Sequence, residues 1–291
     1  MLNNYFLSPF KSQEYYKLFH DTELELNEVY SFVSNIFNDR SQLLKQSANL
    51  AQHLYNKSTH PNIKGGEFYV VYFNDCILEG EKVDTIGIFK SENKDTFLKV
   101  FSQNKDFAIE SQEGININKL DKGCLIFNKE SETGYVVSVI DKTNKSIDAQ
   151  YWIDDFLHVK QRNDEFYNTK NTLSMYKNFV VKQLPQEFEV SKADQADYLN
   201  RTMDFFKEKE HFELNEFKKE VLQQEDVINS FQNFKDSYQQ EREMKISDSF
   251  EISRTAVQKQ IPLYKSVFKL DKKFPYICSW AIAIEIETGE K

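Results

Sequence analysis

Apolar residues near the N-terminus recur every three to four positions, which is the spacing of one face of an α-helix. Two such runs lie between residues 26 and 54, and their apolar members are Val29, Val33, Ile36, Leu43, Leu50 and Leu54. The pattern predicts two amphipathic helices, one on each side of Asp39, and the Gly65-Gly66 pair ends this helical part.

Short runs of β-branched and aromatic residues follow, separated by turns rich in Asn, Asp, Gly and Lys. The runs cover residues 67–73, 83–89, 96–101, 124–127 and 135–140. They predict a mostly antiparallel sheet packed by the two early helices. We assign this sheet and its helices to a first domain, residues 1–150.

The helical spacing returns after about residue 150 and predicts a helical bundle with a Phe-rich core over residues 151–262. Ser191 and Asp194 fit a capping box at the start of one helix. The apolar stripes contain Leu173, Tyr176, Val180, Leu184, Leu199, Met203, Phe206, Leu214, Phe217, Val221, Phe231, Phe234 and Tyr238. Alternation in residues 263–291 predicts a short terminal β-hairpin, so the expected fold class is α+β.

Glycine usage supports this division into two halves. Of the 8 glycines, all but Gly289 lie before residue 135. The change in turn chemistry near residue 145 therefore coincides with the change in apolar period.

Composition narrows the class of protein. The 25 Phe and 15 Tyr provide far more apolar surface than a disordered chain contains. The net charge of -9 disfavours a protein that is basic over its whole surface and binds nucleic acid in that way. Without a signal sequence or an apolar stretch of about 18 residues, the chain is expected in the cytoplasm and not in a membrane.

The sequence contains no signature of a catalytic, cofactor-binding or metal-binding site. GxGxxG, GxxxxGK[ST], HExxH and GxSxG do not occur, and Cys76, Cys124 and Cys278 have the wide spacing of free thiols in a reducing compartment. One alternative stays open, because carboxylates around a strand, a turn and a second strand could hold Mg²⁺ for phosphodiester hydrolysis. These residues are Asp75, Glu79, Glu81 and Asp84, with Lys90 nearby, and the pattern favours a solvated hairpin turn.

A local excess of positive charge interrupts the acidic sequence near the C-terminus. The cations, opposed only by Asp271, are Arg254, Lys259, Lys265, Lys269, Lys272 and Lys273. Three aromatic residues, Tyr264, Phe268 and Phe274, interleave them. This composition is typical of a surface that follows a nucleic-acid backbone, and the alternative is a solvated strand edge.

The order of these segments resembles that of the bacterial 37-kDa nucleoid-associated protein family (NdpA/YejK-like), and most closely its Bacteroidetes-type members. The resemblance spans about Glu67 to Phe274. The segments that carry it are GGEFYVVYF, VDTIGIF, YWIDDFLHV, NTLSMYKNFV, SKADQADYLNRTMDFFKEKEHFELNEFKKEVL and ISDSFEISRTAVQKQIPLYKSVFKLDKKF. The tail after Phe274 departs from the family's ending, and our hypothesis is a truncation or a frame change near Pro275.

The resemblance implies a non-enzymatic protein of the cytoplasmic nucleoid that binds DNA or a DNA-bound partner, without a cofactor. Together with the local stripe, it predicts sequence-tolerant contact with double-stranded DNA. A homodimer is the other expected partner. The alternative function is an acidic protein-interaction or dimerisation module that makes no direct DNA contact.

Overall fold

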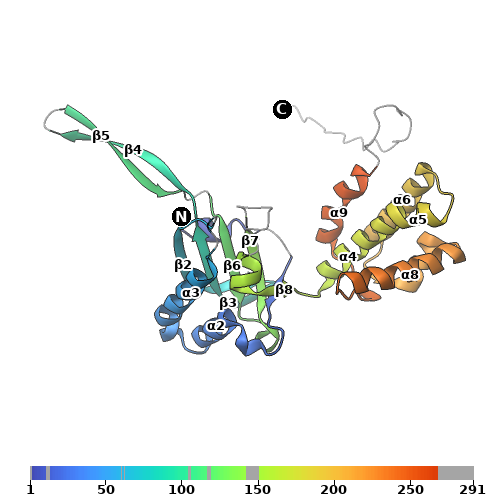
Figure 1. The fold of residues 1–291 in the computed structure, drawn as a ribbon, viewed down its shortest axis with the longest axis horizontal. Coiled ribbons are helices and arrows are strands. Elements are labelled where there is room, and N and C mark those ends of the chain that lie inside the picture. The colour runs from blue at the N-terminus through green and yellow to red at the C-terminus, as the bar shows by residue number, and fades with distance from the viewer. Residues whose placement is uncertain are drawn as a thin grey trace, which may run out of the picture. The chain divides into compact units, whose positions relative to one another are not determined.

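Two compact units make up the protein, one from Met1 to Arg162 and one from Asn163 onward. The computed structural model describes residues 2–10, 14–59, 61, 63–103, 106–116, 119–141 and 151–267 (Figure 1). The first unit contains a six-stranded antiparallel sheet and the second is largely helical, so the predicted α+β fold class is confirmed.

The sheet has the strand order β2-β3-β6-β7-β1-β8. Its strands are β1 (Tyr16–Leu18), β2 (Glu67–Leu78), β3 (Glu81–Ser91), β6 (Lys122–Phe127), β7 (Val136–Asp141) and β8 (Val159–Gln161). The runs at 67–73, 83–89, 124–127 and 135–140 are strands as predicted. The sequence pattern missed β1 and β8, because three residues are too few to show an alternation.

Helices cover both faces of this sheet. Their bounds are α1 (Leu2–Leu7), α2 (Glu28–Asn38) and α3 (Leu43–Lys57), with short turns η1 (Leu24–Leu26), η2 (Arg40–Gln42), η3 (Ser131–Thr133) and η5 (Tyr151–Leu157). The predicted helices are α2 and α3, and their buried stripe packs against Ile86, Ile88 and Ile126 of the sheet. On the other face, the Phe6 ring of α1 stacks on Phe89 with centroids 4.4 Å apart.

The segment 151–161, which the sequence pattern grouped with the second half, packs on the sheet of the first unit. Trp152 and Leu157 of η5 have no exposed surface and lie in the same cluster as the buried residues of α2 and α3. Strand β8 then pairs with β1 over three residues. The first unit therefore ends at Arg162 because its last strand completes the sheet.

A two-stranded ribbon, β4 (Lys94–Gln103) with β5 (Asp106–Ile115), extends away from the sheet (Figure 1). The run at 96–101 is a strand as predicted, but its expected place in the main sheet is wrong. β3 pairs with β2 and β6, and in the described part of the chain β4 pairs only with β5.

The second unit consists of helices closed by a small sheet. Its elements are α4 (Glu165–Asn178), η6 (Phe179–Gln183), α5 (Leu184–Glu187), α6 (Lys192–Glu208), β9 (His211–Glu213), α7 (Leu214–Phe217), η7 (Lys218–Leu222), α8 (Glu225–Glu241), β10 (Ser249–Glu251) and α9 (Arg254–Ser266). The predicted capping box is present, since the Asp194 amide donates to Ser191 Oγ and the Ser191 amide donates to Asp194 Oδ2.

The surplus aromatic residues of this half form its core. Phe217 has no exposed surface, and its ring lies 5.0 Å from the Tyr176 ring, 5.4 Å from Phe205 and 5.5 Å from Phe212. Phe231 is also fully buried. These rings are therefore packing residues, as the predicted Phe-rich core requires.

The short β element of the second unit lies earlier in the chain than expected. It is the antiparallel pair of β9 and β10, with Phe212 opposite Phe250. Residues 263–266, where the terminal β segment was expected to begin, are the last turn of α9, and residues 268–291 lie outside the described part. A strand edge is therefore the wrong interpretation for residues 254–266.

Candidate nucleic-acid interface

Helix α9 carries the described part of the cationic stripe. Ser253 caps its first turn by accepting a hydrogen bond from the Ala256 amide at 3.4 Å. Its buried side chains, spaced three to four residues apart, are Ala256, Val257, Gln260 and Tyr264. The remaining arc faces solvent and includes all three cations of the helix.

Arg254 is exposed but bonded. Its guanidinium Nη1 donates to the carbonyl oxygens of Phe206 at 3.0 Å and Lys207 at 2.8 Å. These carbonyls belong to the last turn of α6, where backbone acceptors lack helical partners and the dipole favours a positive charge. Arg254 therefore joins α9 to α6, and its cationic charge still faces solvent.

Lys259 and Lys265 are both exposed on α9. The Lys259 ammonium lies 4.8 Å from the centre of the Phe166 ring, a cation–π contact that holds the side chain against α4. Lys265 lies in the last turn. The remaining predicted residues, Lys269, Lys272 and Lys273, lie outside the described part of the chain.

The prediction that the aromatic residues of the stripe lie on the surface is wrong for Tyr264. Tyr264 is 3% exposed, and its hydroxyl donates to the Leu173 carbonyl oxygen at 2.6 Å. Burial raises the pKa of this hydroxyl well above its ordinary value. Tyr264 is thus a core residue that cannot stack on a base, while Phe268 and Phe274 lie outside the described residues.

The cationic arc of α9 is a local feature of an acidic unit. Residues 163–267 contain 19 acidic and 15 basic residues, yet none of the acidic ones lies between residues 252 and 267. Glu251, just before α9, lies 3.1 Å from His211 through its Oε1 atom. A phosphate backbone would therefore meet net positive charge on α9 and net negative charge over the unit as a whole.

A second pair of cations lies on the first unit and was not found from the sequence. Lys17 of β1 and Lys160 of β8 are directly opposite in the strand register, and the Lys160 ammonium lies 3.3 Å from the centre of the Phe19 ring. Burial and the charge of Lys17 lower the pKa of Lys160. Since the two lysines are far apart in sequence and both strands are short, no local signal could have revealed the pair.

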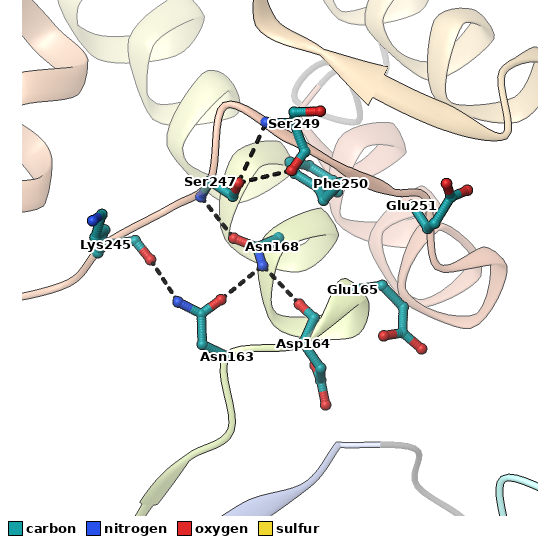
Figure 2. A pocket seen from close by; sticks show the side chains of 9 residues that line it. All are labelled: Asn163, Asp164, Glu165, Asn168, Lys245, Ser247, Ser249, Phe250 and Glu251. Atoms are coloured by element: carbon teal, nitrogen blue, oxygen red, sulfur yellow. Dashed lines mark hydrogen bonds between the residues drawn. The ribbon is translucent and has the colours of Figure 1, made fainter.

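A pocket of about 520 Å³ opens beside the start of α4 (Figure 2). The Asn168 amide nitrogen donates to Asn163 Oδ1 at 2.7 Å, and Asn168 Oδ1 accepts from the Ser247 amide at 2.8 Å. The charged side chains of the lining are Asp164, Glu165, Glu251 and Lys245. Because acidic groups predominate there, the lining does not suit a phosphate group.

Three of the four carboxylates of the nuclease alternative bond to other side chains. Asp84 Oδ2 accepts a hydrogen bond from the Tyr72 hydroxyl at 2.7 Å, while Glu79 pairs with Arg162 at 2.8 Å and with Lys129 at 3.1 Å. Glu81 also pairs with Lys129, at 2.9 Å. Within the described ranges, no group of three or more His, Cys, Asp or Glu side chains could hold a metal ion.

Lys90, the cation of that alternative, belongs to a buried network elsewhere on β3. Its ammonium lies 3.0 Å from Glu92 Oε1 and 3.0 Å from the Tyr151 hydroxyl, and the Lys90 and Glu92 side chains are each 6% exposed. Burial, with the hydrogen bond to Glu92 next, raises the pKa of Tyr151. Lys90 therefore acts as a structural ion-pair partner.

Of the predicted free thiols, Cys76 and Cys124 are free, and Cys278 lies outside the described residues. Burial raises the pKa of the Cys124 thiol. No helix in the described portion of the chain is long and apolar enough to cross a membrane.

The protein is thus a two-unit α+β chain whose helical unit is acidic overall and carries a local cationic helix, α9. The chain belongs to the family described as nucleoid-associated protein YejK, whose family model matches residues 1–275. This is a family of nucleoid-associated proteins and not of enzymes. No curated protein and no solved structure matches the chain.

Proposed function

We propose that this protein associates with the bacterial nucleoid by binding double-stranded DNA directly, with little dependence on sequence, through the exposed arc of α9. The observation that carries the proposal is that Arg254, Lys259 and Lys265 are all exposed on α9, a helix that contains no acidic residue. Cationic side chains bind phosphates, which every DNA sequence presents alike. The proposal places the protein in the cytoplasm, at the nucleoid, and assigns it no catalytic step.

Lys269, Lys272 and Lys273 follow α9 in the sequence and extend the same run of positive charge. We include them in the proposed surface on the basis of sequence order. Arg254 is given a smaller share of the binding, because its guanidinium is already bonded to the α6 carbonyls.

The salt dependence of binding tests the proposal. We expect the wild-type protein to bind a labelled 30-base-pair duplex in fluorescence anisotropy, with an affinity that falls steeply as salt rises. The variant Lys259→Gln/Lys265→Gln should lower the slope of log affinity against log salt by about two, since each phosphate contact contributes about 0.9. A second variant, Lys269→Gln/Lys272→Gln/Lys273→Gln, measures the contribution of the residues beyond α9.

The matched control is Lys182→Gln/Lys219→Gln, which removes two exposed lysines of the second unit that lie outside α9. This control should leave the slope unchanged. Absence of binding by the wild-type protein at 25 mM salt would refute direct DNA contact. An equal loss of slope in the control would refute the assignment of the DNA contact to α9.

A further inference from the structure

The β4–β5 ribbon leaves apolar side chains in solvent. Register pairs across the ribbon share a face, so Val100 and Ile109 lie together, with Leu98 next to Val100 on the same side of β4. Their exposed fractions are 60%, 69% and 71%. A two-stranded ribbon alone is only marginally stable in water, and a long apolar edge strand is a template for pairing with another chain.

Charge decides which kind of partner the ribbon fits. Residues 94–115 contain three lysines and four acidic residues, so the ribbon lacks the cationic excess that DNA phosphates require. Its exposed surface is apolar and of mixed charge, as in a protein–protein contact.

We propose that the outer edge of β4 pairs with the β4 strand of a second copy of this chain, antiparallel, about a two-fold axis at Phe97. In this register Asp95 lies opposite Lys99 of the second copy, and the symmetry makes this contact twice. Phe97 lies opposite itself. Opposite charges and aromatic pairs at directly opposed positions stabilise antiparallel strands, and a two-fold axis requires a self-complementary surface of this kind.

Neighbouring registers and the other edge are less favourable. An axis at Lys99 places two lysines opposite each other, and an axis at Asp95 opposes two carboxylates. Strand β5 contains no lysine or arginine, so its self-pairing brings together only acidic and neutral residues. Of the symmetric registers with an axis from Asp95 to Lys99, only the axis at Phe97 places opposite charges directly across from each other.

The proposed pairing also extends the apolar surface. Leu98 comes opposite Thr96 of the second copy, so the apolar faces of the two ribbons join into one four-stranded sheet. The ion pair between Lys94 and Glu67, 3.0 Å apart at the base of the ribbon, lies at the end of the paired segment and need not break.

Charge reversal tests the register in the full-length protein. Lys99 lies opposite Glu110 within its own ribbon, so each reversal of Lys99 is combined with Glu110→Lys to preserve that internal pair. Asp95→Lys and Lys99→Asp/Glu110→Lys each place like charges across the axis. Sedimentation equilibrium should show a wild-type dimer and at least about a tenfold rise in the dissociation constant of both variants.

The combined variant Asp95→Lys/Lys99→Asp/Glu110→Lys restores opposite charges, and its dissociation constant should return to within about threefold of wild type. A wild-type protein that stays monomeric at 100 μM overturns the proposal. A combined variant that associates as weakly as the two separate ones overturns the register.

Disulfide trapping provides a second readout that does not depend on affinity. In a Cys76→Ser/Cys278→Ser background, Phe97→Cys should form a disulfide-linked dimer on mild oxidation, because directly opposed side chains in paired strands are close enough to be bridged. Ile109→Cys, on β5 and also exposed, should not cross-link. Equal rates for the two variants would contradict pairing at β4, and circular dichroism confirms that both are folded.

Discussion

Asn27 shows how much one buried polar side chain can organise. It is 2% exposed, and its Oδ1 accepts a hydrogen bond from the Tyr30 amide at 2.9 Å as the cap of α2. Its amide nitrogen lies within bonding distance of the Phe19, Leu157 and His158 carbonyl oxygens, at 2.9, 3.0 and 3.1 Å. Asn27 therefore holds the ends of β1 and η5 against the start of α2.

Replacing Asn27 with Ala should lower the free energy of unfolding of the first unit by about 3 kcal/mol, because the cap is lost and buried carbonyls lose their donor. Urea unfolding followed by Trp152 fluorescence, in a Trp280→Phe background, measures the change. The control Asn35→Ala, at an exposed position of α2, should change the free energy of unfolding by less than about 0.5 kcal/mol. Equal shifts in the two variants would show that the Asn27 bonds contribute little.

Residue-scale roles were hard to predict from the sequence. Lys259 and Lys265 were correctly identified as exposed cations, since lysine is rarely buried. Tyr264 was expected on the surface and is buried, because its neighbours in the sequence do not reveal that Leu173 lies beside it. Contacts between residues far apart in the chain decide such cases.

At the scale of elements, the turn between β2 and β3 is tied to two other segments. Glu79 and Gly80 adopt φ of 51° and 84°, the left-handed conformation that a tight two-residue hairpin turn requires. Arg162, at the end of β8, lies 2.8 Å from Glu79 and 2.6 Å from Glu130. A single guanidinium thus links three segments of the first unit.

The ion pairs of Glu79 predict that the stability of the protein depends on pH. Burial acts to raise the pKa of Glu79, but the hydrogen bonds from Arg162 and Lys129 outweigh it and lower the pKa from 4.5. A carboxyl whose pKa is lower in the folded state stabilises the protein above its unfolded pKa, and loses that effect as the pH falls through the folded pKa. Glu79→Gln should therefore destabilise the protein most near neutral pH.

Urea midpoints at pH 7, 5, 4 and 3.5 test this expectation: the gap between wild type and Glu79→Gln should narrow below about pH 4.5. At pH 7 the exposed substitution Glu132→Gln should change the free energy of unfolding by less than about 0.5 kcal/mol. A gap that stays constant across this range would contradict the role of the Glu79 ion pairs.

Most elements were predictable because each long helix or strand repeats its own period. The pattern missed the three-residue strands β1 and β8, and it also missed the ten-residue strand β5. The position of β4 was also missed. Its sequence has strand character, but whether a strand joins a sheet depends on which edges are already paired.

At the scale of the whole molecule, the protein has two separate cores. The buried apolar clusters of the first unit lie between residues 5 and 157, and that of the second between 173 and 264, with none shared among the described residues. Each unit therefore has its own source of stability.

Core substitutions should affect one unit at a time. Phe217→Ala should destabilise the helical unit by about 3–5 kcal/mol, and Ile36→Ala the sheet unit by about 2–5 kcal/mol. Both side chains have no exposed surface. Trp152 fluorescence follows the sheet unit and circular dichroism at 222 nm follows mainly the helices. A Phe217→Ala protein in which the Trp152 transition shifts equally would show that the two units unfold together.

The sequence alone was sufficient for the α+β class, the capping box of α6 and the location of the cationic run, because periodicity, turn residues and composition are local properties. The remaining features depend on long-range packing. Tyr264 is buried, and Arg254 is bonded to α6. Lys17 lies opposite Lys160, and the outer edge of β4 is unpaired in the described chain. Each of these outcomes depends on which distant segments meet, and no local period encodes that.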